Sequence, residues 1–181
     1  MLGDSLTKHG RTWGNIDPEA EVLNHGVGGD TAGCVLRRLS RTTGLRPEWI
    51  FLLAGVNDLA QGFSPESVEE GHIKIWSAVA SLSPESRLVV CSLLPMVESL
   101  FDWGPGTRLS NDLVRKANRL LGRAAENFRL DFLDLHPAFA EPDGSLRRDL
   151  TDDGVHLLGP AYPIWESLVR DFLSSKSSGG R

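Results

Sequence analysis

Two uninterrupted apolar runs set the strongest limit on how this chain can fold. Residues 49–54 read Trp-Ile-Phe-Leu-Leu-Ala, and residues 87–92 contain Leu-Val-Val-Cys. Neither run alternates with polar residues, and both are short, so each is predicted to be a strand buried on both faces. A sheet with such strands needs helices on both sides, which indicates a parallel α/β arrangement.

The rest of the chain alternates between strand and helix patterns in a way that fits this arrangement. Further predicted elements are strands at 20–23 and 130–134, and helices at 31–39 (capped by Asp30), from Ser64–Pro65, from near Ser110, and at 160–173. We therefore expect a three-layer α/β/α, flavodoxin-like fold with a parallel sheet in the order 2-1-3-4-5. Residues 1–173 are predicted to form a single domain, and the Ser/Gly-rich residues 174–181 a flexible C-terminal tail.

Composition limits the partners. The 181 residues, 40% of them hydrophobic and 24% charged, suit one globular domain. The formal net charge of -5 disfavours nucleic acid or an anionic membrane as the main partner. No run of about 18 apolar residues is present, so no membrane span is expected. No secretory hydrophobic region follows Met1, because Gly3, Asp4 and Lys8 interrupt it, which predicts a cytoplasmic location.

Polar, glycine-containing segments follow the predicted strands. Gly26-Val27-Gly28-Gly29-Asp30 follows the strand at 20–23, and Gly55-Val56-Asn57-Asp58 follows the strand at 49–54. Gly3-Asp4-Ser5-Leu6 opens the chain, and Asp153-Gly154-Val155-His156 lies near its end. The carboxyl ends of parallel strands meet at one edge, so these segments are expected to converge there. A serine, a histidine and an acid together have the chemistry of acyl transfer, because a base must take the serine proton and an acid must orient the base.

In this order and spacing the four segments resemble the four blocks of the SGNH, or GDSL, hydrolase superfamily. Residues 23–31, Leu-Asn-His-Gly-Val-Gly-Gly-Asp-Thr, and Leu93-Leu94-Pro95 are similar to the platelet-activating-factor acetylhydrolase subunit group. The resemblance covers nearly the whole chain. Ser5 is followed by Leu6-Thr7 and lacks the G-x-S-x-G elbow of ordinary α/β-hydrolases, which argues against that other class.

The resemblance implies a serine esterase or acylhydrolase that acts on small esters, with short acyl groups such as acetyl favoured. Ser5 would be the nucleophile, His156 the general base and Asp153 the residue that orients His156. The backbone N–H groups of Ser5 and Gly29 and the side-chain amide of Asn57 would form the oxyanion hole. No metal and no cofactor is implied, and the expected partner is a small-molecule ester.

Other roles for the polar residues remain open at this point. Asp152 is a rival for the acid, although only Asp153 matches the D-x-x-H pattern. Asp4, Asp30 and Asp58 are expected to hold loops through backbone N–H groups. The remaining histidines are interpreted as non-catalytic, although His25 is close enough in sequence to Gly29 to line a pocket; they are His9, His25, His72 and His136.

Two other functions compete with the esterase hypothesis. A metallophosphoesterase could use the carboxylates, the amide and the imidazole of Asp4, Asp30, Asn57, Asp58 and His156, but the histidines such a site needs are scattered along the chain. A non-catalytic binding module on a hydrolase scaffold is the other alternative. Phe101 and Trp103, in a loop with Gly104-Pro105-Gly106, are either part of the site or an ordinary surface loop.

The start of the chain conflicts with this fold. Only Met1-Leu2 precedes Gly3, whereas the first strand of a 2-1-3-4-5 sheet lies at its centre. Two residues cannot pair with both neighbours along their length. We therefore expect a truncated first strand, uncovered apolar surface, and a natural product that begins upstream of Met1.

Overall fold

A five-stranded parallel sheet in the order β2-β1-β3-β4-β5 forms the centre of the protein. The structure is a computed structural model that describes residues 1–11, 13–101, 104 and 107–178. The strands are β1 (Leu2–Gly3), β2 (His25–Gly26), β3 (Trp49–Leu53), β4 (Arg87–Cys91) and β5 (Asp131–Leu133). The parallel α/β fold and its strand order are confirmed.

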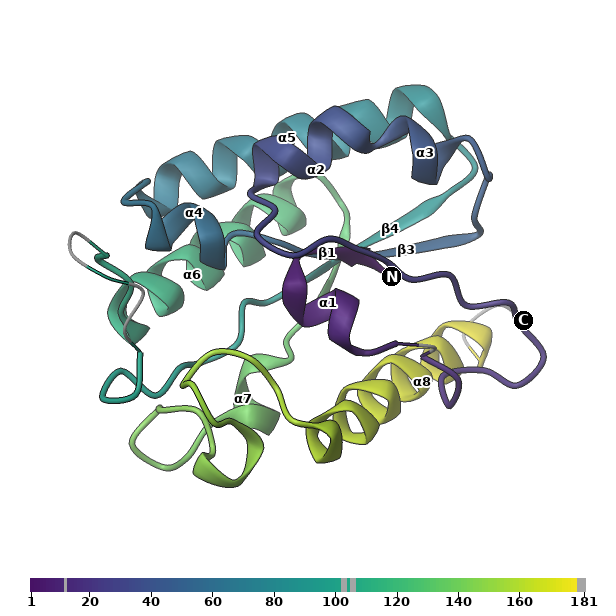
Figure 1. Ribbon diagram of the computed structural model, residues 1–181. Helices are drawn as coiled ribbons and strands as arrows, with labels where there is room; N and C mark the ends of the chain where they lie inside the picture. The colour runs from purple at the N-terminus through teal and green to yellow at the C-terminus, as the bar shows by residue number, and fades with distance from the viewer. Residues whose placement is uncertain (12, 102–103, 105–106, 179–181) are drawn as a thin grey trace.

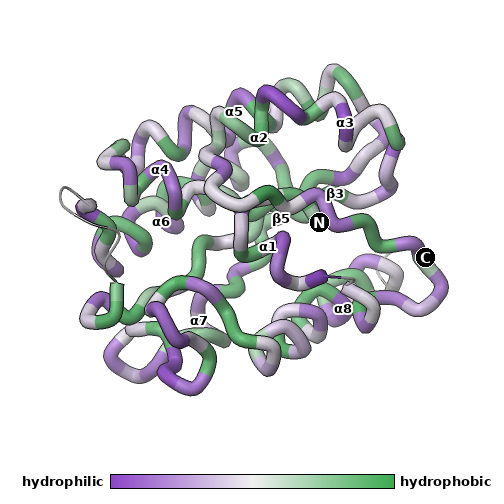
Figure 2. Tube along the Cα trace, viewed as in Figure 1, coloured by the Kyte–Doolittle hydropathy of each residue, from purple (hydrophilic) through white to green (hydrophobic). Residues whose placement is uncertain are grey.

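Helices cover both faces of the sheet, as Figure 1 shows, with α2, α5 and α6 on one face and α1 and α8 on the other. The α-helices are α1 (Ser5–His9), α2 (Ala32–Arg38), α3 (Ser40–Thr43), α4 (Val56–Ala60), α5 (Pro65–Leu82), α6 (Asn111–Asn127), α7 (His136–Phe139) and α8 (Tyr162–Ser178). Two 3₁₀ turns, η1 (Arg148–Leu150) and η2 (Gly159–Ala161), precede α8. Figure 2 shows hydrophobic residues concentrated in the sheet region between the two helix layers.

The first strand departs from the sequence-based expectation. Leu2 pairs with His25 on β2 and with Leu52 on β3, and Gly3 pairs with Gly26 and Leu53 in the same way. The backbone N–H of Val27 adds a 3.0 Å hydrogen bond to the carbonyl of Gly3. The expectation that this segment could not bridge both neighbours is therefore wrong: β1 is short, yet it joins β2 to β3 at the edge where the polar segments lie.

The second strand is displaced from its predicted position, and the helix after it lies where predicted but has a different cap. Residues 20–23 do not form a strand, and β2 is instead His25–Gly26, because these residues stand opposite the short β1. Thr31, not Asp30, caps α2, since its hydroxyl accepts the backbone N–H of Cys34 at 3.3 Å. The predicted cap at Ser64 is confirmed, and the helix predicted to start near Ser110 is capped by that residue; each serine accepts a first-turn backbone N–H.

The last helix extends beyond its predicted end. Helix α8 continues to Ser178, so residues 174–178 of the predicted tail are helical, and residues 179–181 lie outside the described part of the chain. Its buried face carries aromatic residues: Trp165 lies edge-on to Trp13 with ring centroids 4.9 Å apart, and Phe172 lies 5.7 Å from Phe51. These contacts bury large apolar side chains between α8 and the sheet, which anchors this helix layer.

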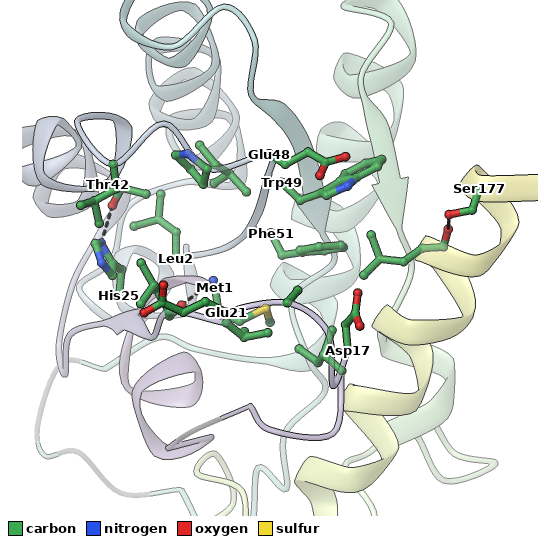
Figure 3. A pocket seen from close by; sticks show the side chains of 18 residues that line it. Met1, Leu2, Asp17, Glu21, His25, Thr42, Glu48, Trp49, Phe51 and Ser177 are labelled. Carbon is green, nitrogen blue, oxygen red and sulfur yellow. Dashed lines mark hydrogen bonds between the residues drawn. The ribbon is translucent and has the colours of Figure 1, made fainter. Parts of the chain in front are cut away.

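A cavity of about 460 Å³ lies at the amino-terminal ends of the strands, below the start of β1 (Figure 3). Its wall includes Leu2, Leu23, Trp49 and Phe51, together with Leu173 from α8. The cavity exists because β1 pairs β3 only at Leu52 and Leu53, which leaves no strand residue beside Trp49. It therefore lies at the opposite end of the strands from the polar segments.

Candidate active site

Ser5 is held at the carboxyl end of β1 by the turn that starts α1. Asp4 is the N-cap of this helix, and its Oδ1 accepts the backbone N–H of Leu6 at 2.9 Å. The hydroxyl of Tyr162 on α8 donates to the carbonyl of Leu6 at 3.0 Å. Ser5 is thus the first residue of a helix that is tied to the sheet and to α8.

Gly3 lets β1 approach its neighbours closely enough to place this turn. A Cβ atom on Gly3 would lie 2.2 Å from the carbonyl oxygen of Leu53 and 2.4 Å from Oγ1 of Thr7. Both atoms belong to buried residues, so a larger side chain would push β1 away from β3 or α1. The glycine of the Gly3-Asp4-Ser5-Leu6 motif is therefore required by packing.

Three predicted site residues form a continuous hydrogen-bonded chain. Oγ of Ser5 lies 3.0 Å from Nε2 of His156, and Nδ1 of His156 lies 2.6 Å from Oδ2 of Asp153. Ser5 and His156 are 151 positions apart in the sequence. The structure therefore brings together the hydroxyl, imidazole and carboxylate that the sequence motifs indicated.

The carboxylate of Asp153 is oriented by its own loop. Its Oδ1 accepts the backbone N–H groups of Val155 and His156 at 2.9 and 2.7 Å, which leaves Oδ2 for the imidazole. Partial burial raises the pKa of Asp153, but the hydrogen bonds from His156 and Val155 outweigh it and hold the pKa below its ordinary value. Asp153 is therefore ionised at neutral pH and suited to pair with an imidazolium.

Gly154 allows the Asp153–His156 loop to pack against the segment after β4. It has φ +87°, and a Cβ there would lie 2.5 Å from the carbonyl oxygen of Val97. The backbone N–H of Val97 donates to the carbonyl of Gly154 at 2.8 Å, and Phe101 lies against the same glycine. The segment that contains Phe101 thus borders this loop, whereas Trp103, Pro105 and Gly106 lie outside the described residues.

The predicted oxyanion residues follow β2 and β3, the two neighbours of β1. Gly29 has φ +78°, and no atom lies within 4 Å of the position its Cβ would take, so space is open beside this loop. Asn57 is buried in α4, and its Nδ2 donates to the carbonyl of Asp30 at 2.9 Å. An amide nitrogen carries two hydrogens, so one remains for another acceptor.

Three residues that sequence reasoning did not assign hold these loops together. Arg38 on α2 pairs with Asp30 at 2.5 Å and donates to the carbonyl of Gly3 at 2.8 Å, which joins the Gly29 loop to β1. The buried imidazole of His72 lies 2.8 Å from the carbonyl of Ala54, at the end of β3 before Asn57. Burial lowers the pKa of His72 to about 4, so the ring is neutral and donates from Nε2.

Asn24 is the third of these residues. Its side-chain amide donates to the carbonyls of Thr7, Lys8 and Arg11 at 2.9–3.1 Å, and its Oδ1 accepts the N–H of Gly26. It therefore closes the carboxyl end of α1 and ties it to β2. The sequence signal for this residue is an asparagine directly before a predicted turn. No local pattern indicates that its amide would bond to three carbonyls more than ten positions away.

The remaining predicted residues occupy other positions. Asp58 accepts the backbone N–H of Ala32 at 3.0 Å, as expected of a loop-holding carboxylate, while Asp30 instead pairs with Arg38. His25 binds Oγ1 of Thr42 at 2.8 Å and lines the cavity at the far end of the strands. Asp152 is exposed, and Asp153 is the carboxylate that meets His156.

Within the described ranges, no group of three or more His, Cys, Asp or Glu side chains is arranged to hold a metal ion. None of the helices found between residues 1 and 178 is both long enough and apolar enough to cross a membrane.

Comparison with known proteins identifies the family. The profile of the GDSL-like Lipase/Acylhydrolase family matches residues 1–162. Platelet-activating factor acetylhydrolase IB subunit alpha1 of Bos taurus is 31% identical over 174 residues, which are 93% of this chain and 72% of that protein. A match over most of the chain shows that the protein belongs to the GDSL-like lipase/acylhydrolase family, within the SGNH hydrolase superfamily.

Solved structures agree with this fold. A GDSL-like lipase from Bacteroides thetaiotaomicron superimposes with a TM-score of 0.85 at 20% identity, covering 97% of this chain and 86% of that one. An acetyl xylan esterase superimposes with a TM-score of 0.75 at 18% identity, covering 94% and 96% of the two chains. At these identities the likeness establishes the fold, and the family assignment supports a hydrolase of the esterase or acylhydrolase type.

Asp4 is a fully buried carboxyl directly beside Ser5. Burial raises its pKa to about 7, the hydrogen bond from Leu6 lowers it, and the negative charges of Asp30 and Asp58 raise it. No hydrogen-bond partner of its Oδ2 is found in the described part of the chain. The folded protein therefore holds a proton on Asp4 over a pH range in which the unfolded chain has released it.

This difference predicts a pH-dependent stability. The pKa rises from 3.8 to about 7 on folding, so the favourable contribution is complete below pH 4 and is lost as the pH rises to 7. The loss amounts to roughly 4 kcal/mol at 1.36 kcal/mol per pKa unit. Asp4→Asn cannot ionise, so we expect its free energy of unfolding, measured by urea denaturation, to lack this decrease between pH 4 and 7.

Asp171→Asn is a matched control, because Asp171 is exposed on α8. It should show the same pH dependence as the unsubstituted protein. Parallel curves for Asp4→Asn and the unsubstituted protein would contradict the assignment of a protonated Asp4.

Proposed function

We propose that this protein is a serine esterase that hydrolyses small esters with short acyl groups, using Ser5, His156 and Asp153. The observation that carries the proposal is the hydrogen-bonded chain from Ser5 through His156 to Asp153, at the carboxyl end of β1. Membership of a lipase/acylhydrolase family supports the same chemistry. In this arrangement a serine hydroxyl has both the base and the oriented acid that acyl transfer requires.

The reaction proceeds in two halves. Oγ of Ser5 attacks the ester carbonyl carbon while Nε2 of His156 takes the hydroxyl proton, and the carbonyl π electrons move to oxygen to form a tetrahedral oxyanion. When this intermediate collapses, the ester C–O bond breaks and His156 returns the proton to the leaving alcohol. Water then attacks the acyl-Ser5 carbonyl with His156 again as base. Collapse of the second intermediate breaks the bond between the acyl carbon and Oγ of Ser5, His156 returns the proton to Oγ, and the carboxylic acid leaves. Asp153 stabilises the imidazolium formed in each half.

The oxyanion is held by the N–H groups of Ser5 and Gly29 and by the amide of Asn57. The first N–H groups of a helix have no partner within that helix. The capping carboxylate of Asp4 accepts the N–H of Leu6, so the N–H of Ser5 is available for the oxyanion. The open space beside Gly29 and the second amide hydrogen of Asn57 support the other two contacts. Such donors act most strongly where charge develops in the transition state.

A short acyl group fits an open site. The side chains of His156 and Asp153 are 31% and 47% exposed, and the cavity of about 460 Å³ lies at the other end of the strands. The exposed imidazole and carboxylate therefore favour an acyl group that needs little apolar surface to bury beside Ser5. The names of two similar proteins, an acetylhydrolase subunit and an acetyl xylan esterase, point toward acetyl groups as well.

Replacement of the nucleophile tests the mechanism. Ser5→Ala removes the attacking oxygen, so we expect hydrolysis of p-nitrophenyl acetate to fall to the background rate, measured by release of p-nitrophenolate. Circular dichroism should show an intact fold, because alanine is well tolerated at the first position of a helix. Unchanged turnover by the folded variant would refute the assignment of Ser5, and retention of activity by the unsubstituted enzyme after chelation would exclude a metal-dependent route.

Replacement of Asn57 tests the oxyanion hole. Asn57→Ala removes one donor, and we expect kcat to fall roughly 100-fold with little change in KM, because the lost interaction acts in the transition state. Asn127→Ala, at an exposed position at the end of α6, is the control and should leave kcat unchanged. An equal loss in both variants, or a change confined to KM, would argue against this role for Asn57.

A series of acyl-chain lengths tests the substrate class. We expect kcat/KM to be highest for p-nitrophenyl acetate and to decrease through the butyrate and octanoate esters. Burial of each additional methylene would contribute about 0.8 kcal/mol, or about fourfold in kcat/KM, if an apolar acyl pocket were present. A steady increase of that size with chain length would contradict the short-acyl proposal while leaving the esterase mechanism intact.

A further inference from the structure

A second imidazole lies against the imidazole of the proposed triad. The ring centroids of His9 and His156 are 5.4 Å apart, and their planes are inclined by 46°. His9 is the last residue of α1, four positions after Ser5, and residues at this spacing share one face of a helix. The same short helix therefore supplies the serine on one side of His156 and a ring on another.

The contact with His156 is the main interaction of the His9 side chain. Across the parts of the chain that the structure describes, no hydrogen bond to the His9 ring is found, and its ring contact is with His156. His156 meets Ser5 through Nε2 and Asp153 through Nδ1, so neither ring nitrogen is committed to His9. His9 can therefore affect His156 through ring packing and through its charge.

We propose that His9 is a positioning residue: its neutral ring supports the catalytic imidazole in line with Ser5, and its protonated ring opposes the imidazolium that forms on His156. The inference rests on the proposed esterase mechanism. A ring packed against the imidazole of His156 restricts the rotation of that imidazole about its own side-chain bonds. The positive charge that develops on His156 during each proton transfer is disfavoured by a second positive charge at this distance.

The groups around His9 shift the protonation of its ring to below neutral pH. Burial lowers the pKa of His9, and His156 and Lys8 lower it further, while Asp153 raises it and Arg11 lowers it. The net pKa lies below the ordinary value of 6.5. His9 is therefore neutral at pH 7 to 8, where it supports His156, and becomes charged as the pH falls through its pKa.

Four variants separate the two effects. His9→Ala removes the ring, and we expect kcat on p-nitrophenyl acetate to fall about threefold to tenfold with KM nearly unchanged, the range expected for loss of one ring contact. His9→Phe keeps a ring without a charge and should restore kcat at pH 8. His9→Lys places a permanent charge beside His156 and should lower kcat at all pH values, with partial recovery in 1 M salt. Lys8→Gln, which changes the exposed neighbour on the same helix, should leave kcat at pH 8 unaltered.

The pH profile distinguishes positioning from a purely structural role. In the unsubstituted enzyme, kcat/KM below pH 6.5 should fall with a steeper slope than one ionising group produces. In His9→Phe the slope should be that of a single ionising group. Identical limbs in the two proteins, or wild-type kcat in His9→Ala, would overturn the inference. If Ser5→Ala abolishes activity while His9→Ala does not change it, only the role of His9 fails; if Ser5→Ala remains active, the esterase mechanism itself fails.

A measurement that does not depend on activity completes the test. NMR titration of the His9 ring should give a midpoint below 6.5 that rises in His156→Phe, because that substitution removes a positive neighbour from His9. An unchanged midpoint would show that the two rings are not coupled in solution and would overturn the inference.

Discussion

The site depends on the pairing of a very short strand with two neighbours. Leu2 and Gly3 bond to β2 on one side and to β3 on the other, and the absence of a side chain on Gly3 lets β1 come close to the backbone of β3 and to the side chain of Thr7 on α1. Ser5 follows directly, so its position is set by the sheet and by the cap on Asp4. Because β2 and β3 lead into the Gly29 and Asn57 loops, the same pairings also place the two other segments of the proposed oxyanion hole.

Polar contacts between loops hold the site residues in the positions that the sheet gives them. Arg38 links Asp30 to the carbonyl of Gly3, and the amide of Asn57 meets the carbonyl of Asp30, so the loops after β1, β2 and β3 are held as one unit. Rigid support of this kind is what oxyanion stabilisation needs, since donors that must reorganise during the reaction contribute less. The opposite end of the strands lacks this support. There no residue of β1 lies between Leu23 and Trp49, and a cavity fills the space.

Much of this architecture was predictable because the signals are local. The apolar runs at β3 and β4, the serine cap of α5 and the start of α6 depend on neighbouring residues, and they lie where expected. The failures have a common cause. Strand β2 lies at His25–Gly26 because these residues pair with β1. Thr31 caps α2 because Asp30 instead pairs with Arg38, eight positions away. Pairing with distant partners outweighed local preference in both cases.

By itself the sequence determined the parallel α/β class, the motifs with a serine, an acid and a histidine, and the family they resemble. The class follows from periodicity, and the resemblance rests on the four motifs in their order. Only the tertiary structure decided that two residues suffice to join β2 to β3, that Asp4 is buried beside Ser5, and that the rings of His9 and His156 meet. The reason is that burial and distance join residues up to 151 positions apart along the chain, and no local pattern records which side chains the fold will place in contact.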